Sequence, residues 1–178
     1  MLDFAILGLL HEAPMHGYEL RKRLHDVLGA WRTFSYGSLY PTLRRLLRAG
    51  LIAEEAPDPR KWGGRAKRVY KLTADGKEHF AGMLADAGPQ TWDDESFGVH
   101  MAFFSRTPAE VRMRILEGRR RCVEERREGF RSSMSRAGEQ IDRYTRELHR
   151  LGLETSEREV RWLNELIAHE QREQREAD

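Results

Sequence analysis

Three amphipathic segments begin the chain. Apolar residues recur every three or four positions in each of them, which is the spacing of a helix with one buried face. The predicted helices cover residues 2–11, about 18–28 and about 38–48. Pro14 follows the first, Gly29 is a suitable C-cap for the second, and Gly50 ends the third.

Two short segments after the third helix have the character of strands. Residues 51–56 form the first, and residues 68–72 alternate as expected for the returning strand. The intervening residues include Gly63 and Gly64, which favour a turn. Thr73 is a good N-cap for a fourth helix. The order helix, helix, helix, strand, turn, strand, helix predicts a winged helix-turn-helix domain over residues 1–87.

The second part of the chain, residues 88–178, is predicted to be entirely helical. Gly88 and Pro89 mark the boundary. Apolar residues then recur every seven positions at Leu116, Val123, Phe130, Ala137, Tyr144 and Leu151. This heptad pattern predicts one long helix over 107–151 that packs along another helix. Gly152 is expected to end it, and a last helix is expected over about 156–172.

The predicted fold class is therefore mainly α with a small two-stranded β-wing. A long helix with one apolar face needs a partner surface in water. Residues 107–172 are accordingly expected to form a homodimerisation arm. Two-fold symmetry would then present two copies of the N-terminal domain to one duplex, about one helical turn apart.

Positive charge is concentrated in the N-terminal domain. Residues 32–71 contain ten Lys or Arg and three acidic residues, whereas the whole chain has a net charge of only +2. Such a concentration on a helix and a hairpin indicates a polyanionic partner, which we predict to be double-stranded DNA. No apolar run is long enough to cross a membrane, and the single cysteine excludes an internal disulfide. We expect a cytoplasmic protein.

The third helix and the wing supply the candidate DNA contacts. With Leu39 set at the centre of the buried face, a helical wheel places polar and basic residues on or beside the opposite face. The helix candidates are Ser38, Pro41, Thr42, Arg44, Arg45 and Arg48. The wing candidates are Arg65 and Lys67, beside the glycines that permit a close approach to a groove.

An ordered set of short motifs resembles the PadR family of bacterial winged-helix regulators. The motifs are Ile6–Leu10, His16–Leu20, Gly37–Leu43, Gly50–Ile52 and Gly64–Thr73. The resemblance implies a transcriptional repressor, usually a homodimer on a palindromic operator. It also implies DNA contacts by Tyr40, Pro41, Arg44 and Arg65. The helical wheel alone prefers Arg45 to Tyr40, and both remain candidates. The length and helical pattern of the second part resemble the larger subgroup of the family.

Aromatic and methionine side chains gather where the two predicted domains join. A pocket formed by them would suit a small aromatic effector whose binding alters DNA affinity. The candidate effector residues are Trp92, Phe97, Met101, Phe104 and Trp162. The alternative is that these side chains are ordinary core residues.

Other functions find less support in the sequence. No phosphate-binding glycine loop or nucleophile motif is present, so we do not expect an enzyme. The histidines lack metal-ligand spacing, and no cofactor or metal is expected. Cys122 follows three arginines, which could lower its pKa, but a buried position in the helix is the simpler interpretation. The competing function is a winged-helix module that binds protein or RNA without sequence-specific DNA binding.

Overall fold

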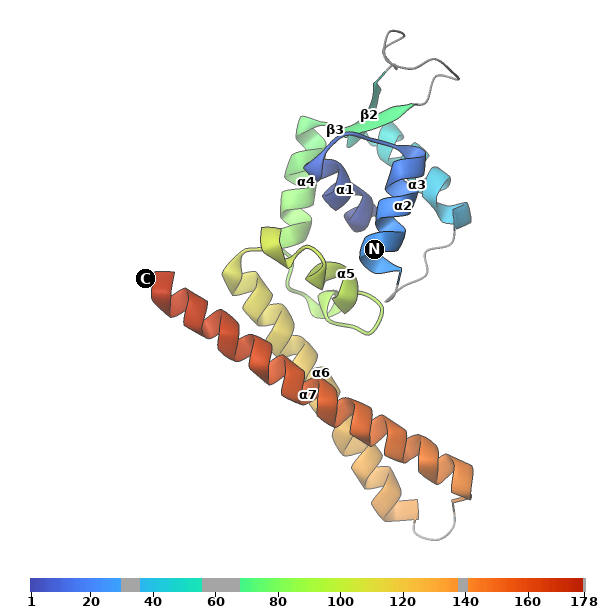
Figure 1. Cartoon of the computed structure of the whole chain (residues 1–178), viewed down its shortest axis with the longest axis vertical. Helices are drawn as coiled ribbons and strands as arrows, with labels where there is room; N and C mark the ends of the chain where they lie inside the picture. The colour runs from blue at the N-terminus through green and yellow to red at the C-terminus, as the bar shows by residue number, and fades with distance from the viewer. Residues whose placement is uncertain (30–35, 56–67, 138–140, 178) are drawn as a thin grey trace. The chain divides into compact units, whose positions relative to one another are not determined.

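The computed structural model describes residues 1–29, 36–55, 68–137 and 141–177 (Figure 1). The chain divides into two compact units. The first contains residues 1–86 and 94–108, and the second contains residues 87–93 and 109–178. Each unit is described separately below. No helix in the described ranges is long and apolar enough to cross a membrane.

The first unit has the predicted winged-helix order with one additional short strand. Its elements are α1 (Leu2–Glu12), β1 (Met15–His16), α2 (Gly17–Leu28), α3 (Tyr36–Arg48), β2 (Ile52–Glu55), β3 (Val69–Leu72) and α4 (Ala74–Ala85). The strands form an antiparallel sheet in the order β1-β3-β2. The sequence analysis missed β1, because two residues are too few to show an alternating pattern. The predicted mainly α fold with a small β-wing is confirmed, with three strands in its sheet.

Helix α1 is the centre of the core in this unit. Every residue from Phe4 to Leu10 is buried, so α1 is enclosed on all sides by its neighbours. This explains why its apolar residues are not restricted to one face. Helices α2 and α3 each contribute one apolar face, including Leu20 and Leu43, and α4 contributes Phe80.

Thr73, between β3 and α4, makes hydrogen bonds to the start of α4 and to the residue that follows α3. Its hydroxyl accepts a hydrogen bond from the backbone N–H of Gly76 at 3.0 Å, as an N-cap does. The same hydroxyl donates to the carbonyl oxygen of Gly50 at 2.7 Å. Gly50 adopts a φ of 71°, a left-handed conformation that favours glycine. The end of α3 and the start of α4 are therefore held together.

The segment 94–108 packs within the first unit and contains α5 (Phe97–Met101) and the 3-10 helix η2 (Phe104–Arg106). Phe103 is 2% exposed, and its ring lies against Gly8 of α1. A side chain at position 8 would occupy the space of this ring. The two compact units therefore differ from the predicted domains 1–87 and 88–178, because residues 94–108 pack with the first unit.

The second unit is a hairpin of two long helices, α6 (Ala109–Ala137) and α7 (Arg143–Ala177), which lie side by side (Figure 1). The short 3-10 helix η1 (Pro89–Thr91) also belongs to it. The predicted helix over 107–151 is wrong, as is the predicted break at Gly152. The chain leaves the helix after Ala137, and Asp142 caps α7 by accepting hydrogen bonds from the N–H groups of Tyr144 and Thr145.

Gly152 lies inside α7 for a packing reason. The ring of Phe130, on α6, fills the space that a Cβ at position 152 would need. The glycine thus permits close approach of two helices and does not end one of them. The sequence analysis treated it as a helix breaker because its tertiary partner was unknown.

Apolar contacts and partly buried ion pairs hold the hairpin together. Buried residues on α6 include Ile115, Leu116 and Val123, and α7 contributes Val160, Leu163 and Ile167. The guanidinium of Arg112 binds Glu170 through three hydrogen bonds of 2.7–3.0 Å. Arg119 Nε donates to Glu159 at 2.7 Å. Removing one partner of such a pair leaves a charge poorly solvated, so these pairs favour one register of the helices.

Candidate nucleic-acid interface

Helix α3 presents a buried face and an exposed face. Leu39, Leu43 and Leu46 face the core. The exposed residues predicted to contact DNA are Tyr40, Pro41, Arg44, Arg45 and Arg48, and Ser38 is half-buried. Thr42 is only 8% exposed. The helical-wheel prediction of an exposed Thr42 is therefore not met, because this residue packs with the leucines on the core side of the helix.

A hollow of about 330 Å³ lies beside the exposed face of α3. Tyr40 of α3 lines it together with residues from β1, α2, β3 and the position just before β3, namely His16, Gly17, Tyr18, Tyr70 and Arg68. The side chains of Tyr18 and Tyr40 are strongly exposed, at 70% and 51%. Aromatic rings that are exposed side by side on a small domain are typical of an interaction surface.

The short strand β1 builds one wall of this hollow. Met15 pairs with Tyr70, and His16 pairs with Val69. His16 Nδ1 also lies 3.4 Å from the carbonyl oxygen of Arg68. Because α2 begins directly after β1, this pairing fixes the position of Tyr18 in the first turn of α2. A Cβ at position 17 would lie 3.4 Å from the ring of Tyr40, so the glycine allows a close approach here.

Two acidic residues of β2 form ion pairs with basic residues at or beside β3. Arg68 Nη1 donates to Glu54 Oε1 at 3.0 Å, and Lys71 Nζ donates to Glu55 at 2.9 Å. Burial raises the pKa of the Tyr70 hydroxyl above its ordinary value, and the Glu54 carboxylate raises it further. Tyr70 therefore remains a neutral hydrogen-bonding group at physiological pH.

Arg44 and Arg45 differ in their surroundings. Arg44 follows Tyr40 by four residues and lies on the same side of α3, where its charge acts on Tyr70. The Arg45 guanidinium instead forms an ion pair with Asp3 of α1. The structure thus favours Tyr40 and Arg44, the pair implied by the family resemblance, as members of one surface. Arg65 and Lys67 lie outside the described residues.

The sequence analysis missed Tyr18, His16 and Arg68 as candidate contacts. Tyr18 and His16 belong to a motif used for the resemblance, but only the fold brings them beside Tyr40. We call Tyr18, Tyr40, Arg44 and Arg68 the tyrosine–arginine surface. It combines aromatic faces, phenolic hydroxyls and guanidinium groups, all of which can contact phosphates or base edges.

Comparison with known proteins identifies this part of the chain. Residues 6–82 match the Transcriptional regulator PadR-like family. These residues form a PadR-like domain. The range includes α1, the three strands, α2, α3 and most of α4, and therefore the whole tyrosine–arginine surface.

Individual relatives agree with this assignment. The chain is 29% identical over 97 residues to the negative transcriptional regulator PadR of Bacillus subtilis. The aligned region covers 53% of this chain and 52% of that protein. It therefore spans about half the length of this curated relative. The relative and the matched family are transcriptional regulators and not enzymes.

Solved structures of PadR proteins match the chain at low identity. Bacillus subtilis PadR in complex with operator DNA is 22% identical, with 95% of this chain and 98% of that chain covered and a TM-score of 0.45. A PadR family regulator of Clostridium difficile is 23% identical, with coverages of 46% and 81% and a TM-score of 0.41.

The candidate effector residues are divided between the two units. Phe97 is buried, and Met101 and Phe104 are half-buried, all on the segment that packs with the PadR-like domain. Trp92 and Trp162 belong to the second unit and are half-buried. Within that unit, the Trp92 ring packs against Gly118 of α6, and its carbonyl oxygen accepts a 3.2 Å hydrogen bond from Arg119. Trp92 therefore has a packing role of its own.

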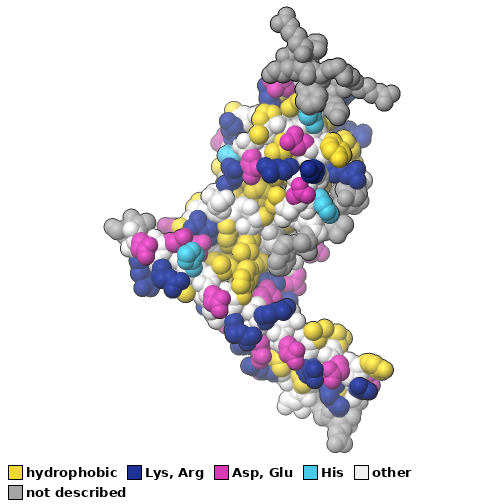
Figure 2. All heavy atoms as spheres, viewed as in Figure 1, with side chains coloured by type: hydrophobic (Ala, Val, Ile, Leu, Met, Phe, Trp, Pro, Cys, Tyr) yellow, Lys and Arg dark blue, Asp and Glu magenta, His cyan; other side chains and the backbone are white. Residues whose placement is uncertain are grey.

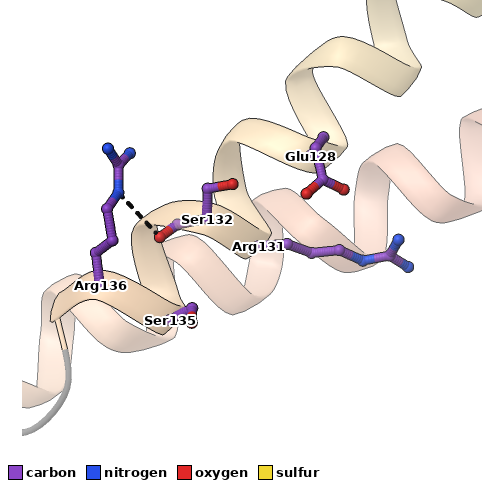
Figure 3. Close-up of a pocket in the computed structure, with 5 residues that line it drawn as sticks. All are labelled: Glu128, Arg131, Ser132, Ser135 and Arg136. Atoms are coloured by element: carbon purple, nitrogen blue, oxygen red, sulfur yellow. Dashed lines mark hydrogen bonds between the residues drawn. The ribbon is translucent and has the colours of Figure 1, made fainter.

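An open hollow of about 460 Å³ lies near the end of α6 (Figure 3). It is lined by Glu128, Arg131, Ser132, Ser135 and Arg136. Figure 3 shows that the two arginine side chains extend in different directions. Arg131 pairs with Glu157 of α7 at 2.8 Å, and Arg136 Nε donates to the carbonyl oxygen of Ser132 at 3.2 Å. This arrangement does not form a converging anion site.

Two further expectations concern metal binding and the cysteine. No group of three or more His, Cys, Asp or Glu side chains that could hold a metal occurs in the described ranges. Cys122 is half-buried in α6.

Proposed function

We propose that this protein is a DNA-binding transcriptional regulator that acts as a homodimeric repressor on a palindromic operator. The observation that carries the proposal is the tyrosine–arginine surface, where Tyr40 and Arg44 of α3 adjoin Tyr18 and Arg68. The relative described as a negative transcriptional regulator supports repression. Such a protein would act in the cytoplasm.

Base reading is assigned to α3. Its first turns would enter the major groove, with Tyr40 and Pro41 at the exposed face. Arg44 could donate two hydrogen bonds to the O6 and N7 atoms of a guanine. Ser38, Arg45 and Arg48 would contact phosphates beside this position. The hydroxyl groups of Tyr18 and Tyr40 would add hydrogen bonds to the backbone of the duplex.

The wing is assigned to the neighbouring phosphates or minor groove. Arg68 directly precedes β3, and its guanidinium is exposed and paired with Glu54. Arg65 and Lys67 precede it in the sequence and would extend the same positive charge. A protein that replaces several phosphate counterions in this way binds with a strong dependence on salt.

Dimerisation is assigned to the second unit. Tyr144, Leu148 and Leu151 of α7 are 82%, 64% and 60% exposed. Their spacing of four and three residues places them in one row along the helix. Figure 2 shows apolar side chains exposed toward the far end of the hairpin, between clusters of charged residues. A second copy of α7 would bury this row.

Release by a small aromatic effector is the remaining part of the proposal. Trp92, Met101, Phe104 and Trp162 are half-buried aromatic or polarizable side chains that a planar ligand could contact, whereas the burial of Phe97 suits a core role. Titration of the protein–operator complex with phenolic acids would test this part. Unchanged operator affinity throughout would contradict it.

The decisive experiment measures duplex binding by fluorescence anisotropy. The full-length protein would be titrated with its own upstream intergenic DNA and with a scrambled duplex, at 50 and 200 mM salt. We expect a preference for the native sequence and a loss of about 10³-fold in affinity at the higher salt. Weak binding that is indifferent to sequence, followed by an empty genome-wide selection, would instead support the protein- or RNA-interaction module.

A further inference from the structure

The segment 94–108 is anchored in the core of the PadR-like domain. The Phe103 ring meets Phe4 edge-on with 5.3 Å between ring centroids, and it meets Phe80 edge-on at 6.1 Å. Thr107 adds a hydrogen bond from its hydroxyl to the carbonyl oxygen of Phe103, at 3.1 Å. The segment is therefore a structural part of the DNA-binding unit, and α6 begins only two residues after Thr107.

Arg106 connects this segment to α1 directly and to α2 through Glu12. Its Nη1 lies 2.8 Å from His11 Nδ1, at the end of α1. Its Nη2 lies 3.5 Å from Glu12 Oε1. The other carboxylate oxygen, Glu12 Oε2, accepts a 2.8 Å hydrogen bond from Arg23 of α2. Glu12 therefore bridges Arg106 and Arg23, and α2 is the helix that precedes the reading helix α3.

We propose that Arg106 is a positioning residue that sets the placement of helix α2 on the segment 94–108 through Glu12. The Phe103 anchor keeps the segment seated on α1 while Arg106 and Glu12 set the position of α2. The proposal rests on the proposed function, because its consequence is a change in how α3 meets DNA.

The physical basis is geometric rather than a large stabilisation. The side chains of Arg106, Glu12 and Arg23 are 32%, 33% and 46% exposed. Ion pairs in such positions add little to the free energy of unfolding. A carboxylate shared by two guanidinium groups nevertheless favours one relative placement of the elements that carry them. A network of this kind can bias one arrangement of a two-state element.

The test uses Arg106→Gln in the full-length protein, with Arg114→Gln as the matched control. Arg114 is an exposed arginine of α6 whose Nε donates a hydrogen bond to the carbonyl oxygen of Glu110, in the same helix, at 3.4 Å. Hydrogen–deuterium exchange would be measured for residues 17–28, together with the melting temperature and the affinities for operator and scrambled DNA.

We expect Arg106→Gln to raise amide exchange in α2 and to lower operator affinity by about threefold to tenfold. The affinity for scrambled DNA and the melting temperature should change no more than in the control. Exchange and operator affinity equal to those of Arg114→Gln would overturn the proposal. Glu12→Gln removes the same bridge from its other side, so it should reproduce the effect, and the double variant should add little to either single change.

The two proposals fail in different ways. A wild-type protein that binds no duplex specifically would contradict the proposed function, yet the exchange of α2 amides would still decide whether Arg106 positions this helix. If Arg106→Gln lowers the melting temperature, Arg106→Lys retains the charge. Restored stability with persistently raised α2 exchange would then support positioning by the guanidinium fork, and full restoration of both would contradict it.

Discussion

The guanidinium of Arg45 on α3 pairs with the carboxylate of Asp3 on α1. Arg44, the preceding residue, lies instead on the side of α3 that carries Tyr40. Two adjacent arginines of one helix therefore have different neighbours. Arg45 is held by an ion pair within the protein, whereas the charge of Arg44 acts on Tyr70.

Arg44→Ala is expected to cost about 1–3 kcal/mol of operator binding free energy and to relax the choice of sequence. Arg45→Ala should weaken operator and scrambled duplexes by similar, smaller amounts, since part of its charge is already neutralised by Asp3. Competition anisotropy with both duplexes would measure this. A larger loss of discrimination in Arg45→Ala would return the base-reading role to Arg45.

Gly152→Ala is expected to lower the free energy of unfolding by about 1–2 kcal/mol, because the added methyl group would overlap the Phe130 ring. Guanidinium denaturation followed by circular dichroism would measure it. Gly129→Ala is the matched control on α6. A Cβ there would meet no heavy atom of the described residues within 4 Å. That change should stabilise the helix by about 0.5–1 kcal/mol. Equal effects from both changes would contradict the packing role of Gly152.

The exposed row on α7 should control the oligomeric state. Replacing Tyr144, Leu148 and Leu151 by glutamine removes the apolar surface assigned to the dimer. We expect sedimentation equilibrium to show a monomer at micromolar concentration, with weaker operator binding because two sites are no longer linked. Glu147→Gln with Arg150→Gln changes neighbouring charged residues and should leave the dimer intact. A dimer that persists in the triple variant would place the interface elsewhere.

Tyr70 should make the protein less stable at alkaline pH. Its folded-state pKa is raised by burial, so above about pH 10 the folded state retains a proton that the unfolded chain has released. The free energy of unfolding should therefore fall as the pH rises through this range. Denaturation curves between pH 8 and 11 should show a smaller decrease for Tyr70→Phe than for the wild type. Tyr18→Phe, at an exposed position, is the control and should lose as much stability with rising pH as the wild type does. If Tyr70→Phe also loses as much as the wild type, Tyr70 is not the cause of the decrease.

Local patterns predicted most elements of the PadR-like domain. The apolar spacing of α1 and α2, the Thr73 cap and the glycine after α3 are features of neighbouring residues, and they identified these elements to within a few positions. The positive charge between residues 32 and 71 likewise depends only on composition. These properties predicted most of the order of elements and a polyanionic partner.

Tertiary contacts decided the rest. A heptad pattern is equally compatible with one long helix and with two helices that share a periodicity by chance, so it could not show that α6 ends at Ala137 and α7 begins at Arg143. The partner of Gly152 is Phe130, twenty-two positions earlier in the sequence, and the strand β1 exists only because β3 pairs with it. Segments far apart in the chain also bring the Phe103 ring against Gly8. They likewise give Arg44 and Arg45 different neighbours. The sequence by itself determined most helices and strands of the PadR-like domain and where charge collects, because those depend on near neighbours; the tertiary structure decided where α6 ends and α7 begins, and which faces meet.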